Sequence, residues 1–128
     1  MRYQYKIPSI PPSNNKYQGN GSLGKNFEYQ AEKQTWAELI FYNTFPRPPY
    51  PLARAKVTLH YFFKDKRRRD PDNYSGKFIL DGLVKAGILQ VDSFSVIELE
   101  LKASVDPLRR GYTEITIDIA NGEKVEKK

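Results

Sequence analysis

The sequence predicts an α+β fold, in which two helices pack on one face of a four-stranded, mostly antiparallel or mixed sheet. Two observations carry this prediction. Four segments alternate apolar and polar residues, which is typical of strands with one buried face, and two others repeat apolar residues at helical spacing. No internal repeat or break in composition divides the chain. Residues 1–128 are therefore expected to form one domain, with 121–128 as a frayed polar tail.

The first two strands follow from alternation alone. In residues 2–7, Tyr3, Tyr5 and Ile7 share one side of an extended chain. The sequence RAKVTLHYFF, residues 54–63, alternates most clearly along its length. It predicts a strand with one fully buried face.

The last two strands are expected at residues 95–105 and 112–119, which also alternate. The sequence DPLRRG separates them, and its Asp, Pro and Gly are typical of a turn. We therefore expect these two strands to form a hairpin.

Two helices lie between the predicted strands. Apolar residues recur at helical spacing over 27–45, with Trp36 on the core side, until the sequence PRPPYP ends the helix. A second helix is expected over 73–87, with Gly87 as its C-terminal stop. Residues 8–24, rich in Pro, Gly and Asn, predict a long loop before the first helix.

Composition excludes several kinds of site. The chain has no cysteine, which excludes disulfides, thiolate metal sites and cysteine nucleophiles, and its single His60 excludes zinc sites that need two imidazoles. A formal charge of +6 favours a polyanionic partner. The sequence has no apolar run long enough for a signal peptide or a membrane span, so we expect a cytoplasmic protein with no membrane partner.

Residues 66–82, KRRRDPDNYSGKFILDG, place four cations directly before two carboxylates. Asp70 and Asp72 are two residues apart, so their side chains would point the same way on an extended backbone. Oxygen ligands of this kind suit Mg²⁺, which keeps waters for substrate phosphates. Asp92, after the second helix, is the expected third ligand. The pattern predicts a magnesium site beside a surface that binds phosphates.

The sequences RRRDPDN and LDGLVKAGI, with Lys77 between them, Asp92 in VDS and PPSNN near the start, resemble the RusA family of Holliday junction resolvases across nearly the whole chain. This resemblance implies a phage or prophage endonuclease in a bacterial cytoplasm. It also implies a homodimer that binds four-way DNA junctions and nicks two opposed strands with Mg²⁺, or with Mn²⁺ in its place. We expect no small-molecule cofactor.

The resemblance assigns catalysis to Asp70, Asp72, Asp92 and Lys77, and metal binding to the three aspartates. Lys77 would stabilise the pentacovalent phosphate or the departing oxygen. Phosphate contacts are expected from the basic run and from the loop that contains PPSNN, at Lys66, Arg67, Arg68, Arg69, Asn14 and Asn15.

Two departures from the family pattern keep a second hypothesis open. One extra residue precedes Lys77, and Val91 stands where the family has the first Asp of an Asp-Asp pair. A junction-binding or RNA-binding module with decayed catalysis would tolerate both changes. All three predicted ligands are present, which favours the enzyme.

Some of these residues also have simpler structural interpretations. Asp72 would serve as a helix cap, and Lys77 would pair with Asp81 one helical turn away. His60 is expected to be structural or exposed on the polar side of its strand, and Trp36 to belong to the core.

Overall fold

The computed structural model describes residues 2–13, 23–69, 71–91, 93 and 96–119, with the backbone alone at 23–26 and 71–72. In chain order its elements are β1 (Arg2–Ile7), α1 (Leu23–Asn43), β2 (Ala55–Phe63), the short 3₁₀ helix η2 (Pro71–Tyr74), α2 (Lys77–Lys85), β3 (Ile97–Val105) and β4 (Tyr112–Ile119). The predicted tail at 121–128 lies outside the described residues.

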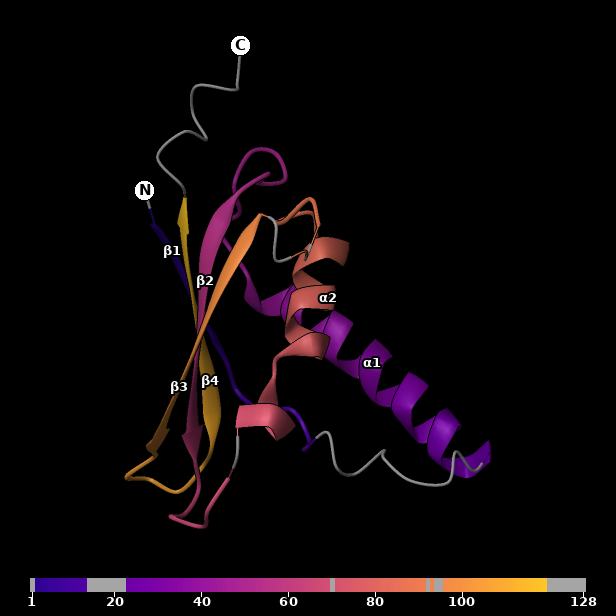
Figure 1. Cartoon of the computed structure of the whole chain (residues 1–128), viewed down its shortest axis with the longest axis vertical. Helices are drawn as coiled ribbons and strands as arrows, with labels where there is room; N and C mark the ends of the chain where they lie inside the picture. Colours follow the sequence, from indigo (N-terminus) through magenta and orange to yellow (C-terminus); the bar gives the residue numbers. More distant parts are fainter. Residues whose placement is uncertain (1, 14–22, 70, 92, 94–95, 120–128) are drawn as a thin grey trace.

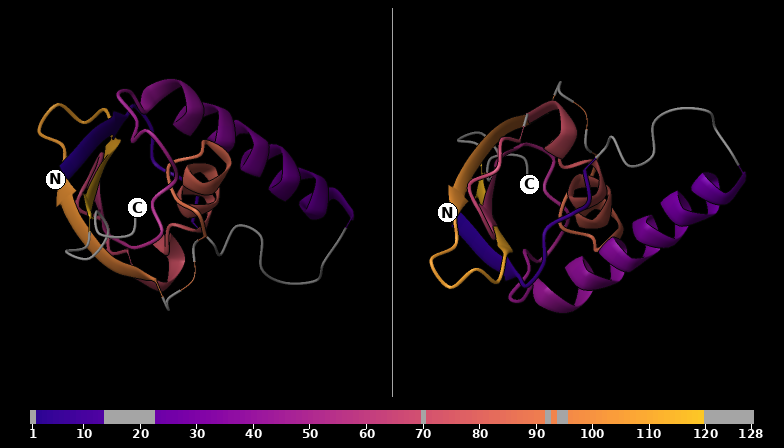
Figure 2. Two further views of the ribbon diagram at one scale, coloured as in Figure 1. Left: turned by 90° about the horizontal axis from the view of Figure 1, so that it is seen from above. Right: turned by 90° about the horizontal axis from the view of Figure 1, so that it is seen from below.

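The four strands form one mixed sheet in the order β1-β4-β2-β3. Strand β4 is antiparallel to both β1 and β2, whereas β2 and β3 run parallel because α2 connects them as a crossover. Both helices cover the same face of the sheet, and no helix of the described residues covers the other face (Figures 1 and 2). The predicted α+β fold class is confirmed.

Alternation in the strands produces the core. Along β2 the buried residues are Ala55, Val57, Leu59, Tyr61 and Phe63, each followed by a partly exposed residue up to Phe63. These side chains pack with Trp36 and other apolar residues of both helices in a single buried cluster. Trp36 is therefore a core residue, as predicted.

The predicted hairpin between the last two strands is wrong. Strands β3 and β4 flank β2 on its two sides, so the turn that joins them passes across the end of β2. The Asp106 N–H donates to the carbonyl oxygen of Phe63 at 2.7 Å, which ties the start of the turn to β2. Asp106 is buried, and its carboxylate accepts hydrogen bonds from the backbone N–H groups of Leu108, Arg110 and Gly111. These bonds close the turn at a width that spans one strand.

Helix α2 is shorter than predicted because Gly76 interrupts the chain. Its φ of 85° is left-handed, and a Cβ atom at this position would lie 2.3 Å from the Leu59 Cδ1 atom. The chain therefore forms η2, breaks at Gly76 and begins α2 at Lys77, without a side chain capping the helix. Asp72 lies within η2 and is not the N-cap of α2. Gly87, with φ of 81°, follows the helix as predicted.

Helix α1 begins at Leu23 and ends at Asn43, so it starts and ends earlier than the predicted 27–45. It crosses α2 closely at Gly82, where a Cβ atom would approach the Ile40 side chain to 2.8 Å. Within the described residues, no helix is long and apolar enough to cross a membrane.

Candidate nucleic-acid interface and metal site

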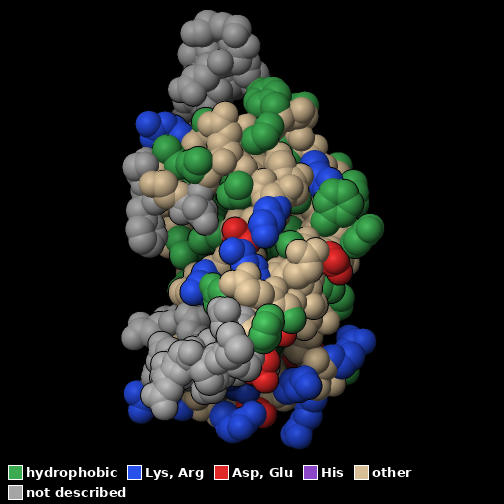
Figure 3. Space-filling model, turned by 90° about the vertical axis from the view of Figure 1, so that its right-hand side faces the viewer, with side chains coloured by type: hydrophobic (Ala, Val, Ile, Leu, Met, Phe, Trp, Pro, Cys, Tyr) green, Lys and Arg blue, Asp and Glu red, His purple; other side chains and the backbone are tan. Residues whose placement is uncertain are grey.

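Two loops bring cations to the end of the sheet where β2 ends. The loop 64–69 follows β2 directly, and the turn 106–111 is bonded to the last residue of β2. Figure 3 shows Lys and Arg side chains gathered at this lower end of the molecule. We call the exposed cations of these two loops the basic end; they are Lys64, Lys66, Arg67, Arg68, Arg109 and Arg110.

Arg109 and Arg110 were not predicted from the sequence to be part of this surface. They lie 40 or more positions from the first basic run, and the expected hairpin gave no reason to place their turn at the end of β2. The sequence LRRG within a turn was the available signal. The pairing of β4 with β2 brings both runs to one surface.

Arg69 differs from its neighbours because its guanidinium is bonded inside the loop. One terminal nitrogen donates to the carbonyl oxygens of Asp65 and Arg67, at 3.1 and 3.0 Å, and the other donates to the Asp65 carboxylate at 2.9 Å. The same guanidinium lies 4.2 Å from the centre of the Phe63 ring. Its side chain is only 16% exposed, against 80% for Arg67. Arg69 therefore shapes the basic loop.

Asp65 is the acceptor at the centre of this loop. The Arg67 backbone N–H, followed by the Arg69 side chain, holds the pKa of the Asp65 carboxyl below its usual value. A lowered pKa means that the bonds stabilise the loop above the ordinary pKa of Asp and are lost as the pH falls through the lowered value. The loop therefore keeps this arrangement at neutral pH. Sequence reasoning missed Asp65 because its partners lie within the loop, where no periodic pattern marks them.

A cluster of three aromatic side chains packs beside the basic loop. The Tyr74 ring of η2 meets Phe63 edge-on at 5.1 Å and Tyr61 at 5.8 Å. These rings and Arg69 line a pocket of about 80 Å³, well below the roughly 300–1,000 Å³ of most ligand sites. Burial raises the pKa of the Tyr61 hydroxyl well above its usual value. The cluster therefore fixes η2 and the basic loop against the sheet.

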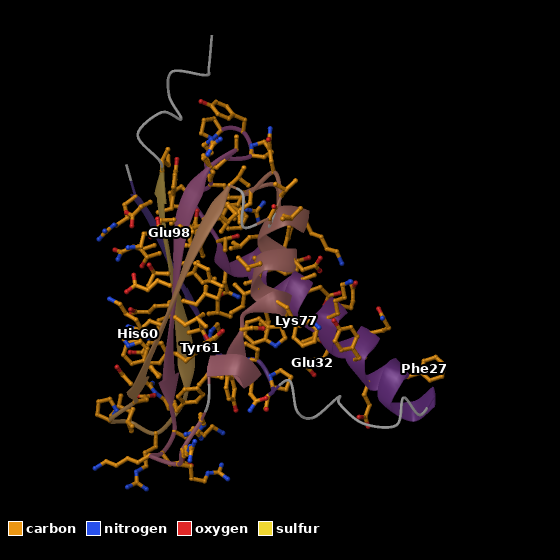
Figure 4. All side chains as sticks on the ribbon, in the orientation of Figure 1. Phe27, Glu32, His60, Tyr61, Lys77 and Glu98 are labelled. Atoms are coloured by element: carbon orange, nitrogen blue, oxygen red, sulfur yellow. The ribbon has the colours of Figure 1, made fainter. Side chains whose placement is uncertain are left out.

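Lys77 begins α2, a short distance along the chain from the basic loop (Figure 4). Its side chain is exposed, and its Nζ atom lies 4.9 Å from the centre of the Tyr29 ring of α1. Asp81 pairs with Lys85 at 3.3 Å, so the predicted pair between Lys77 and Asp81 is wrong. The Lys77 ammonium group is thus placed by a ring contact between the two helices.

Several predicted site residues lie outside what the structure describes. Asp70, Asp92, Asn14 and Asn15 are not described, and Asp72 is described only in its backbone, within η2. In the part of the chain that is described, no group of three His, Cys, Asp or Glu side chains gathers where it could hold a metal ion. The metal site at the three aspartates remains a prediction.

The described residues next to Asp70 and Asp92 lie near opposite ends of β2, which bears on how a metal site could form. Arg69, before Asp70, stacks on Phe63 at the end of β2. Ser93 follows Asp92 in the chain, and its carbonyl oxygen accepts a hydrogen bond from the Ile97 N–H. Ile97 is the strand partner of Ala55 at the start of β2. The start and end of β2 are separated by about 26 Å, at ~3.3 Å per residue. If the ligands lie beside these described neighbours, one ligand-bearing segment would have to reach along the sheet, or ligands would have to come from two copies of the chain.

The interpretation of His60 as a structural residue is supported by its contacts. Its Nε2 atom lies 2.7 Å from the Ser104 Oγ atom on the neighbouring strand, and its ring stacks on Phe62 at 4.1 Å. Burial lowers the pKa of the imidazole. The residue lies on the face of the sheet opposite the helices, away from η2 and α2 (Figure 4).

In comparisons with known proteins, no family model matches the chain and no curated protein matches it.

Proposed function

We propose that this protein is a Mg²⁺-dependent endonuclease that resolves four-way DNA junctions by paired symmetric nicks. The observation that carries the proposal is the basic end, which gathers exposed cations from two loops beside the segment that contains Asp70 and Asp72. Cations of this density favour a polyanion. The resemblance of the sequence to RusA resolvases adds the junction as substrate.

The predicted donor set fits Mg²⁺ because Asp70, Asp72 and Asp92 would offer only carboxylate oxygens. Mg²⁺ held there would lower the pKa of a bound water and neutralise charge on the scissile phosphate, and Mn²⁺ would suit the same oxygens. Lys77 would place its ammonium group against the phosphate as negative charge develops in the transition state.

The other cations would bind the flanking phosphates. Lys66, Arg67 and Arg68 are exposed and would contact the backbone of the junction without reading its bases. Arg109 and Arg110 would extend this contact along the second loop. Arg69 would act mainly by shaping the loop, and Asn14 and Asn15 would add contacts from the PPSNN segment.

We propose that the active form is a two-fold homodimer. Resolution requires two symmetric nicks, and each chain has one predicted metal site, so two copies related by a two-fold axis would cut both strands. A junction resolvase of this kind would act in the cytoplasm, where the DNA is.

The test is incubation of the purified protein with a labelled synthetic four-way junction, with Mg²⁺ or with EDTA. A duplex of the same sequence is the matched control. We expect paired nicks in the junction with Mg²⁺, none with EDTA, and little cutting of the duplex. Binding of the junction without cleavage at any Mg²⁺ or Mn²⁺ concentration would overturn the enzyme and support the decayed binding module.

A further inference from the structure

Helix α1 is the element of the molecule that reaches furthest from the sheet. Its C-terminal half packs on the core through Trp36 and Ile40, while its first turns extend beyond the rest of the described structure (Figure 2). From Phe27 onwards one continuous face of the helix is exposed. We call this the outer face of α1, formed by Phe27, Glu28, Gln30, Ala31, Gln34, Thr35, Glu38, Phe41 and Tyr42.

The chemistry of the outer face does not suit DNA. It has no Lys or Arg and carries two carboxylates, although the whole chain has a formal charge of +6. It exposes large aromatic side chains instead, with Phe27 67% and Tyr42 72% exposed. Phe41 is 44% exposed beside Tyr42 and contacts its ring edge-on. Exposed aromatic side chains of this kind favour a protein partner.

The aromatic residues lie at the two ends of the outer face. Phe27 and Tyr42 are about 22 Å apart along the helix, at ~1.5 Å per residue. The midpoint between them falls between Gln34 and Thr35, where the small side chains of Ala31 and Thr35 would let a second helix approach. A two-fold axis through this midpoint, perpendicular to the helix, would bring Phe27 of one chain against Tyr42 of the other.

Charges on the outer face also match under this symmetry. In the antiparallel register set by that axis, Glu38 faces Ala31 of the other chain, so like charges are not opposed. Glu28 faces Phe41 of the other chain, where the Arg47 guanidinium lies 4.4 Å from the Phe41 ring centre. Each Glu28 would thus approach a cation of the partner copy. The face is complementary to itself, as a two-fold interface requires.

We propose that the outer face of α1 binds the outer face of α1 in a second copy of this chain, with the two helices antiparallel and crossing at Gln34 and Thr35. This locates the contact for the two-fold assembly that the proposed function needs. The exposure, charge and spacing of residues along α1 support this pairing independently of any nuclease activity. A helix pair alone buries less than a standard interface, so the dimer should dissociate on dilution.

The absence of cysteine from the chain allows a direct test by disulfide cross-linking. A Gln34→Cys variant should form a disulfide dimer under mild oxidation, because residue 34 lies beside its own copy at the axis. Phe27→Cys and Tyr42→Cys variants should each stay monomeric on a non-reducing gel, and a mixture of the two should form a heterodimer. Glu98→Cys, exposed on β3 away from α1 (Figure 4), is the control and should not cross-link.

A second measurement uses sedimentation equilibrium on the otherwise native chain. Replacing Phe27 and Tyr42 by Asp should raise the dimer dissociation constant at least tenfold, whereas Leu108→Asp, at an equally exposed apolar residue on the β3–β4 turn, should not. Self-cross-linking of Phe27→Cys, or no cross-link at position 34, would overturn the antiparallel pairing. Either result with normal junction cleavage would leave the proposed function intact, and cross-linking without cleavage would overturn only the function.

Discussion

The basic end and the outer face of α1 are both exposed surfaces, but they carry opposite chemistry. The basic end has six exposed cations on two loops, and Asp65 and Asp106 hold these loops in shape. The outer face of α1 has no cation and exposes aromatic rings. Among the described residues, exposed cations therefore gather at the basic end, whereas the outer face of α1 is a surface suited to a protein. Net charge alone could not have separated the two roles.

The largest effect is expected from the predicted metal ligands. Replacing Asp70, Asp72 or Asp92 by Asn keeps the side-chain size but removes the charge that holds Mg²⁺, so junction cleavage should fall by about 100-fold or more. Junction binding and dimer formation should both survive, because neither the basic end nor the outer face of α1 is changed. Gel-shift and cleavage assays on the same junction measure both properties, and normal cleavage by Asp72→Asn would contradict the metal site.

Mixing these variants tests the condition set by the positions of Arg69 and Ser93. If one active site takes ligands from two copies, a mixture of Asp70→Asn and Asp92→Asn chains should recover part of the cleavage that each variant lacks alone. If each chain holds its own metal, the mixture should remain inactive. Glu98→Gln chains mixed with Asp70→Asn chains provide an active control, because Glu98 is exposed on β3, away from both the basic end and the outer face of α1.

A smaller effect is expected from the cations of the basic end. The Arg67→Ala, Arg68→Ala double variant should bind the junction roughly 10- to 100-fold more weakly and reduce the salt slope by about 2. The Arg109→Ala, Arg110→Ala double variant should behave alike if both loops bind phosphates. Affinity measured across a salt series gives the slope, with Glu98→Gln, on β3 away from both surfaces, as a control that leaves it unchanged. An unaltered slope for Arg109→Ala, Arg110→Ala would confine the interface to one loop.

The sequence predicted the strands well because burial of one face imposes a period of two on Ala55 to Phe63 and on the other strands. It misassigned the connection after β3 because turn residues indicate a turn and not which strands it joins. That choice depends on the parallel pairing of β2 with β3. The start of α2 was missed for a similar reason, since only the contact with Leu59 in three dimensions shows why Gly76 interrupts the chain.

In the candidate site too, the sequence revealed residues that are adjacent in the chain but not contacts that depend on the fold. The sequence identified cations beside carboxylates, because these are adjacent in the chain. It did not separate Arg69 from Arg67, although their positions in the run look equivalent, because the difference comes from the fold of the loop around Asp65 and from the Phe63 ring beneath it. A residue that is bonded within the loop and residues that are proposed to bind phosphate have the same sequence pattern here.

The smallest predicted effect concerns Arg69. Its donors are used within the loop, so Arg69→Ala should weaken junction binding only a few-fold, roughly 2- to 5-fold, by loosening Lys66, Arg67 and Arg68. The salt slope should change little, because few phosphate contacts are lost. Arg69→Lys keeps the charge but lacks the planar group that bonds Asp65 and stacks on Phe63, so it should not restore affinity. Full rescue by Lys, together with a slope lowered by about 1 in Arg69→Ala, would show that Arg69 binds phosphate as its neighbours are expected to do.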